Sequence, residues 1–77
     1  MSFEINFDNQ PIKFLKKLEK EIAERIFKKI MILENNPVPS NARRIEGREE
    51  LVFRIRIGDY RVLYKLNYSG NNISIFK

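Results

Sequence analysis

Four basic side chains in the second half of the chain have the types and spacing to bind a phosphate group: Arg54, Arg56, Arg61 and Lys65. Arginine pairs with phosphate oxygens through two parallel N–H···O bonds, whereas lysine acts as a point charge. Arginine also keeps its proton at all ordinary pH values, so it cannot act as a general base. These residues can therefore hold a phosphodiester and stabilise negative charge that develops on it, while a proton acceptor must come from elsewhere.

The net charge of +5 is distributed unevenly along the chain. Residues 1–40 carry seven Lys/Arg and six Asp/Glu, whereas residues 41–77 carry eight and four, and six of those eight are arginine. A basic, arginine-rich half favours a polyanionic partner, with nucleic acid as the first candidate. The alternative is that these arginines only keep a small sheet in solution.

The composition also excludes several kinds of enzyme. The chain contains no cysteine and no histidine, which removes zinc enzymes, Ser-His-Asp hydrolases and Cys-His proteases. We therefore expect no metal ion and no cofactor. The 77 residues predict a single domain that spans residues 1–77. With neither a long apolar run nor a signal peptide, we expect no membrane partner and a cytoplasmic location.

The elements that must position the basic residues follow from the hydrophobic pattern. Residues 3–7 alternate between apolar and polar types, which predicts a half-buried strand. Between residues 12 and 34 the apolar residues recur at steps of three or four, which predicts helix, and Asn36-Pro37 ends it. The periodicity leaves open whether this stretch is one helix or two with a break near Lys20-Glu21.

The second half of the chain is a run of strands. The segments LVFRIRI (51–57) and YRVLYKL (60–66) are separated by Gly58-Asp59, which favours a two-residue type II′ hairpin turn. After a turn segment, NISIF predicts a final strand. Strands that follow a helical stretch predict an α+β fold, with a small antiparallel sheet and the helices packed on one face.

This turn fixes which residues share a face of the hairpin. Ile57 pairs with Tyr60, and every residue on the face that these two share is apolar or aromatic, so this is the predicted core face. On the other face Arg56 lies directly opposite Arg61, with Arg54 and Lys65 on the same face. Directly opposed like charges destabilise a sheet, which suggests that a ligand supplies the counter-charge.

Three features of the hairpin bear on what that ligand is. The acidic residues Glu49, Glu50 and Asp59 lie at the ends of the hairpin rather than opposite the arginines. Tyr60 and Tyr64 fall on the core face, which predicts a site for phosphates rather than for stacked bases. The alternative is a solvated face whose cations discourage aggregation.

The order of these elements resembles that of the RelE/ParE toxin superfamily, and especially of the archaeal RelE toxins. The segments that carry the resemblance are LEKEIAERIFKKI, the connector NPVP, RRIEG and LVFRIRIGDYRVLYKL. The resemblance implies a type II toxin that cuts mRNA in the decoding site of the ribosome and is neutralised by a RelB-like antitoxin. It implies a small antiparallel sheet and two helices within residues 12–34. It also implies that Arg54, Arg56 and Arg61 are catalytic and that they bind RNA together with Lys65.

One departure from the superfamily pattern affects the expected activity. Relatives usually continue past the last strand with a basic segment that carries an arginine and a tyrosine, whereas this sequence ends at Phe76-Lys77. We therefore expect an intact anion site with impaired or absent catalysis. Two alternatives remain: a ParE-like toxin that poisons gyrase, and a non-catalytic module that keeps antitoxin contact and RNA affinity. The arginine cluster favours the RelE-like function.

Overall fold

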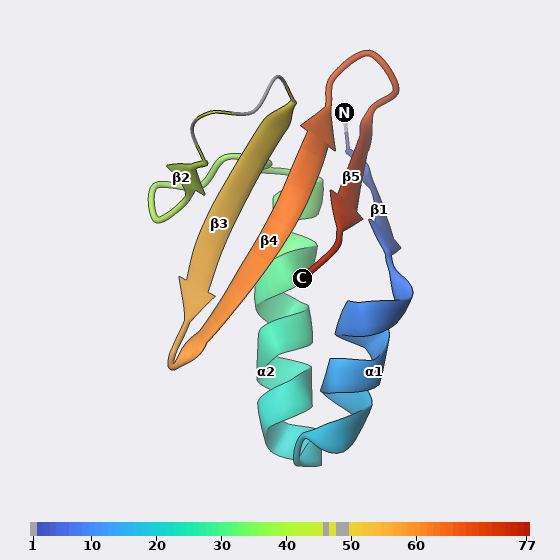
Figure 1. The fold of residues 1–77 in the computed structure, drawn as a ribbon, viewed down its shortest axis with the longest axis vertical. Helices are drawn as coiled ribbons and strands as arrows, with labels where there is room; N and C mark the ends of the chain where they lie inside the picture. The colour runs from blue at the N-terminus through green and yellow to red at the C-terminus, as the bar shows by residue number, and fades with distance from the viewer. Residues whose placement is uncertain (1, 46, 48–49) are drawn as a thin grey trace.

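The structure is a computed structural model that describes residues 2–45, 47 and 50–77. Within these residues two α-helices, a short 3-10 helix and five strands follow one another along the chain (Figure 1). In order they are β1 (Glu4–Phe7), α1 (Asn9–Lys17), α2 (Lys20–Met31), η1 (Ile32–Glu34), β2 (Arg43–Arg44), β3 (Leu51–Ile57), β4 (Tyr60–Asn67) and β5 (Asn72–Ile75).

The predicted helical stretch is two helices, as the resemblance implied. Leu18 and Glu19 both adopt extended backbone conformations, with ψ of 158° and 145°, and so separate α1 from α2. The break lies just before Lys20, beside the polar position that the sequence indicated. The two helices run antiparallel and lie side by side (Figure 1). Neither helix is long and apolar enough to span a bilayer, and the same is true throughout the described residues.

The β3–β4 hairpin has the predicted register. Ile57 pairs with Tyr60 and Arg56 with Arg61, on either side of the Gly58-Asp59 turn. Gly58 has φ +60°, and among the described non-glycine residues only Asn71 has a positive φ. A positive φ at the first central residue alone is the geometry of a type II′ turn. The turn predicted from two residues is therefore confirmed.

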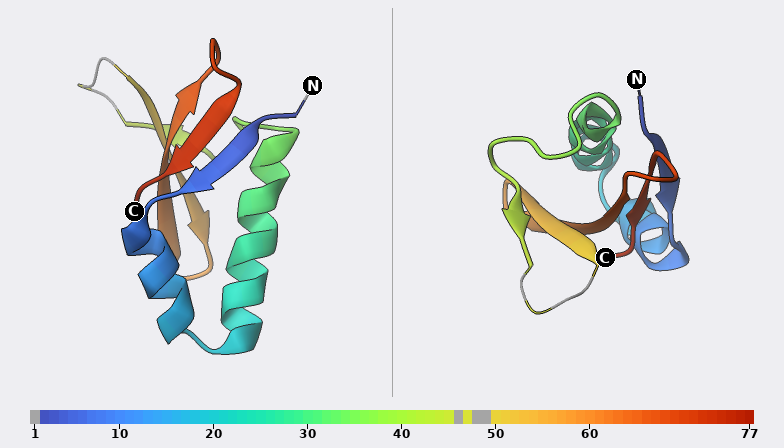
Figure 2. Two further views of the ribbon diagram at one scale, coloured as in Figure 1. Left: turned by 90° about the vertical axis from the view of Figure 1, so that its right-hand side faces the viewer. Right: turned by 90° about the horizontal axis from the view of Figure 1, so that it is seen from above.

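The sheet has the order β1-β5-β4-β3-β2, and it is mixed rather than wholly antiparallel. β1 pairs with β5 in the parallel sense, with Ile5 opposite Ile73 (Figure 2). The alternation of residues 3–7 identified a strand but carried no information on its neighbour or direction. A parallel pair needs a long crossover connection, which α1, α2 and the hairpin supply here.

The core lies between the helices and the predicted core face of the hairpin. Its buried members come from α2, η1, β3, β4 and β5, and they are Ile26, Ile30, Leu33, Phe53, Ile55, Ile57, Val62, Tyr64, Leu66, Ile73 and Ile75. The hydroxyl of the buried Tyr64 donates a hydrogen bond of 2.6 Å to the carbonyl oxygen of Pro37, which ties the connector after η1 to the sheet. Burial raises the pKa of the Tyr64 hydroxyl, with a smaller contribution from Tyr68, so this donor keeps its proton.

Candidate nucleic-acid interface

The three predicted arginines, Arg54, Arg56 and Arg61, lie together on the face of the sheet that points away from the helices, here called the basic face. Arg56 and Arg61 are direct cross-strand partners, which places their Cβ atoms about 4.5–5.5 Å apart. Arg54 lies two residues before Arg56 on β3, about 7 Å away on the same face. Arg56 and Arg61 are exposed and Arg54 is half-buried. Strand pairing alone therefore assembles the three guanidinium groups.

No described acidic residue neutralises these arginines. Within residues 2–45, 47 and 50–77, a single ion pair forms, between Lys65 Nζ and Glu50 Oε2 at 3.2 Å. Glu49, which the sequence placed at the end of the hairpin, lies outside the described residues. Opposed like charges without a carboxylate between them favour binding of an anion from solution.

Lys65 lies on the same face but at the far end of β4, about 13 Å along the strand from Arg61. Its ammonium group is paired with Glu50 and lies 5.7 Å from the centre of the Phe76 ring. The charge of Lys65 is thus partly balanced within the chain, unlike the charge of the arginines. Its role in RNA binding stays a prediction.

A fourth arginine joins the cluster from β2. Arg43 is the cross-strand partner of Arg54, whereas the next residue, Arg44, is the partner of Phe53 and so lies on the opposite face. Both are exposed. A strand of two residues has too few positions to show an alternating pattern, so the position of Arg43 on this face was not predictable from the sequence.

A hollow of about 490 Å³ opens beside Arg54 and Arg61. Its other lining residues come from α1, the β2–β3 region, the hairpin and the last residue: Phe14, Ile45, Asp59, Tyr60, Leu63 and Lys77.

Tyr64 is fully buried, as predicted. Tyr60 is only half-buried and borders the hollow, with its ring 5.7 Å from that of Phe14. Tyr60 nevertheless lies on the core face with Ile57 and packs against the core, so the prediction of its face is confirmed.

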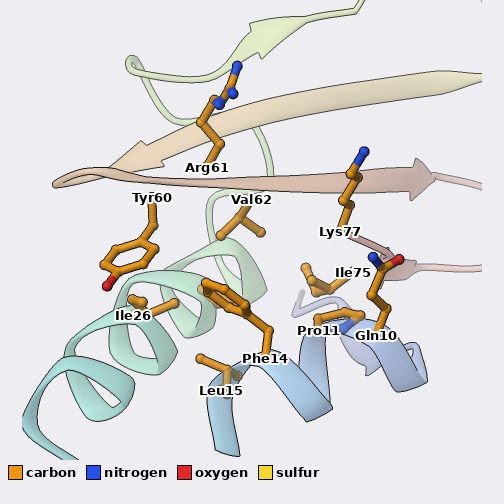
Figure 3. Close-up of a pocket in the computed structure, with 11 residues that line it drawn as sticks. Gln10, Pro11, Phe14, Leu15, Ile26, Tyr60, Arg61, Val62, Ile75 and Lys77 are labelled. Carbon is orange, nitrogen blue, oxygen red and sulfur yellow. The ribbon is translucent and has the colours of Figure 1, made fainter. Parts of the chain in front are cut away.

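On the other side of β4, an apolar cleft of about 250 Å³ lies between α1, α2 and the sheet (Figure 3). Its walls include Phe14, Leu15, Ile26 and Val62. β5 pairs with β4 only from Tyr64 onward, so the first residues of β4, which pair with β3 on one side, border this cleft on the other. Arg61 points away from the helices, on the opposite side of β4 from Tyr60 and Val62 (Figure 3). The apolar cleft and the basic face thus meet along the start of β4.

The family of the chain follows from comparison with known proteins. A family model described as the ParE toxin of the type II toxin–antitoxin system parDE matches residues 5–77. This chain belongs to the RelE/ParE toxin superfamily. It is 31% identical to RelE1 of Methanocaldococcus jannaschii, an alignment that covers all of this chain and 88% of that protein. The resemblance in the sequence is confirmed.

Solved structures of RelE toxins share the fold. The chain superimposes on the archaeal RelE of the Pyrococcus horikoshii RelE–RelB complex with a TM-score of 0.89 and 33% identity, over 100% of this chain and 92% of that chain. For the E. coli RelBE complex the TM-score is 0.81 at 19% identity, over 99% and 93% of the two chains. The α+β fold of the RelE toxins, with two helices packed on a small sheet, is thereby confirmed.

The face that carries Arg54, Arg56 and Arg61 has the groups for phosphate chemistry. Among the described residues no three acidic side chains lie together as a metal site. The arginines can bind the non-bridging oxygens of a phosphodiester and stabilise charge that develops there. Among the described residues that line the hollow, Asp59 is the one with a carboxylate side chain. The sequence placed Asp59 at the end of the hairpin but did not connect it with the arginines.

Proposed function

We propose that this RelE-like toxin binds mRNA in the decoding site of the ribosome, in the cytoplasm, and cuts it there. The observation that carries the proposal is the cluster of Arg54, Arg56 and Arg61, which has no described acidic partner and borders a hollow. A surface of this kind suits a phosphodiester better than an uncharged ligand. The similarity to archaeal RelE toxins supports mRNA as the substrate.

Cleavage would use the 2′-hydroxyl of the RNA as the nucleophile. Its oxygen attacks the adjacent phosphorus, the 5′ oxygen of the next nucleotide leaves, and a cyclic phosphate remains. Arg61, together with Arg54 and Arg56, would hold the phosphate and stabilise the charge that grows on its oxygens. The 2′-hydroxyl proton needs an acceptor that no arginine can provide. Asp59, which borders the same hollow as Arg61, is the acceptor that this chain offers.

The proposed partner that silences the toxin is a RelB-like antitoxin. Solved relatives from Pyrococcus horikoshii, Mycobacterium tuberculosis and E. coli are complexes of toxin with antitoxin. The apolar cleft offers a place for apolar side chains, with Arg61 and Lys77 among its lining residues. A chain with net charge +5 also favours an acidic partner. An antitoxin seated there would cover the start of β4 and restrict access of RNA to Arg61.

A ParE-like gyrase poison is the second candidate, because the matching family model is that of the ParE toxin. Poisoning of gyrase does not need a surface that cleaves phosphodiesters, so the arginine cluster favours the RelE-like activity. A third candidate is a non-catalytic module that retains binding to antitoxin and to RNA. Assays on ribosomes and on gyrase separate the three.

The deciding experiment is a cleavage assay on purified ribosomes programmed with a short mRNA. We expect the wild-type chain to cut the codon in the decoding site, at a rate that also tests the impaired catalysis expected from the sequence. Arg61→Ala should lose at least about a hundredfold in rate, because removal of one charge-stabilising donor costs roughly that much. Arg44→Ala is the matched control, since it removes the same charge from the opposite face. An excess of cognate antitoxin should suppress the wild-type activity.

The other outcomes are equally informative. A loss with Asp59→Asn of similar size to that with Arg61→Ala would support Asp59 as the proton acceptor, and an unchanged rate would assign that role to the ribosome. Equal rates for Arg61→Ala and Arg44→Ala would contradict the proposed site. Absence of ribosomal cleavage together with inhibition of gyrase supercoiling would support the ParE-like alternative, and absence of both would support the binding module.

A further inference from the structure

The basic face extends beyond the β3–β4 hairpin onto β2. Arg43 on β2 is directly opposite Arg54, so their side chains project from the same face of the sheet about 5 Å apart at Cβ. Arg61 lies diagonally across from Arg54, because the direct partner of Arg54 is Leu63. Diagonal neighbours of this kind are about 7–8 Å apart. Arg61, Arg54 and Arg43 thus form a row that crosses β4, β3 and β2.

The charges on this face differ in how they are balanced. Arg43, like Arg54 and Arg61, has no ion pair with any residue in the described part of the chain. Lys65, at the other end of the face, is paired with Glu50. An incoming polyanion therefore gains more from Arg43, whose charge is uncompensated, than from Lys65, whose pairing it must disrupt.

We propose that Arg43 forms a second phosphate subsite, so that a single-stranded RNA crosses the sheet from Arg61 over Arg54 to Arg43 rather than running along the hairpin toward Lys65. The proposal rests on the proposed function in that the bound polyanion is RNA. The phosphate at Arg54 and Arg61 is the reacting one, and the neighbouring phosphate on the same strand binds Arg43. Arg43 is then a positioning residue that fixes the direction of the strand and does not touch the reacting atoms.

Arg44 provides a matched control for Arg43. The two residues are adjacent and both exposed, and either substitution to alanine lowers the net charge by one. Only Arg43 lies on the basic face, since Arg44 is the partner of Phe53. A loss of general electrostatic attraction would affect both variants equally, whereas loss of a phosphate contact would affect Arg43→Ala alone.

The experiment measures binding of a short fluorescein-labelled single-stranded RNA to the free toxin by fluorescence anisotropy at several salt concentrations. We expect Arg43→Ala to weaken binding about tenfold at low salt and to reduce the slope of log K against log salt by about 0.7, the value for one phosphate contact on a single strand. Arg44→Ala should retain the wild-type slope, and Lys65→Ala should reduce it less than Arg43→Ala does. Arg43→Lys should recover most of the slope but not all of the affinity, because lysine cannot bind phosphate in the bidentate mode.

The same series distinguishes failure of the subsite from failure of the proposed function. If Arg54→Ala and Arg61→Ala weaken binding but Arg43→Ala matches Arg44→Ala, the subsite is wrong and the anion site stands. A larger loss with Lys65→Ala than with Arg43→Ala would also overturn the proposal, because the strand would then follow the hairpin. If none of the variants changes RNA affinity, both the subsite and the proposed RNA-binding function are wrong. Thermal unfolding of each variant confirms that the β2 edge is intact.

Discussion

The two faces of the β3–β4 hairpin are built from alternate residues of the same two strands, yet they have opposite relations to the rest of the chain. On the face toward the helices, Ile55, Val62 and Tyr64 are buried in the core. On the other face, Arg56 and Arg61 are paired across the strands with no described carboxylate to balance them. Burial of apolar area stabilises folding, whereas opposed like charges weaken it. Stability and binding are thus assigned to opposite faces, and substitutions on each face should separate them.

The largest effect is expected from Ile55→Ala on the core face. Ile55 is 3% exposed, and its truncation removes buried methyl groups and leaves a cavity, so we expect a loss of about 2–5 kcal/mol in the free energy of unfolding. Urea denaturation followed by circular dichroism measures it. Arg54→Ala, on the adjacent residue of the other face, should change stability by less than about 0.5 kcal/mol. Comparable losses for both variants would contradict the separation of the two faces.

A smaller effect is expected from Tyr64→Phe, which removes one hydroxyl from the core face. The substitution removes the 2.6 Å hydrogen bond to the Pro37 carbonyl, which is part-buried, and loss of such a bond costs about 1 kcal/mol. Tyr68→Phe is the matched control, since Tyr68 is 57% exposed. A loss as small as that of Tyr68→Phe would show that the connector is held by packing alone.

The pH dependence of Tyr64→Phe provides a second measurement of the same bond. Burial raises the pKa of the Tyr64 hydroxyl in the folded protein, whereas in the unfolded chain the pKa of tyrosine is about 10. The contribution of Tyr64 is therefore fully present below about pH 10, and it is lost as the pH rises above that value because the unfolded state releases the proton first. The difference in unfolding free energy between wild type and Tyr64→Phe should therefore shrink from pH 9 to 11.

The success of the sequence-based prediction for the hairpin has a local physical cause. Gly58-Asp59 fixes the turn, and the period of two then assigns every side chain to a face, so the contacts of Arg56 with Arg61 follow without knowledge of the rest of the chain. The same reasoning placed Tyr60 on the correct face but did not predict how far its ring is exposed. Its register position lies on the core face, but the strand begins there and α1 only partly covers the ring, so Tyr60 borders the hollow beside Arg61.

What the sequence could not predict depends on pairing between distant segments. The parallel pairing of β1 with β5 brings together the two ends of the described chain, and no local pattern encodes a neighbour or a direction. Arg43 joins the basic face through a two-residue strand, which is too short for a periodic signal. The ion pair of Lys65 with Glu50 depends on the path of the chain as it enters β3. The centre of the candidate site was therefore predictable, and its extent was not.

The smallest effect, and the one of opposite sign, is expected from Arg56→Glu on the basic face. A glutamate opposite Arg61 replaces repulsion by attraction, and cross-strand pairs of opposite charge contribute about 0.2–1 kcal/mol. We therefore expect the variant to be more stable than the wild type by about 0.5 kcal/mol at low salt while its RNA affinity falls. Arg56→Gln should give an intermediate stability, because it removes the repulsion without adding an attraction.

The gain in unfolding free energy of Arg56→Glu should diminish at 1 M salt, where exposed charges interact only over about 3 Å. A variant less stable than the wild type at low salt would show that Arg56 contributes packing through its aliphatic stem, and the basic face would then serve folding as well as binding.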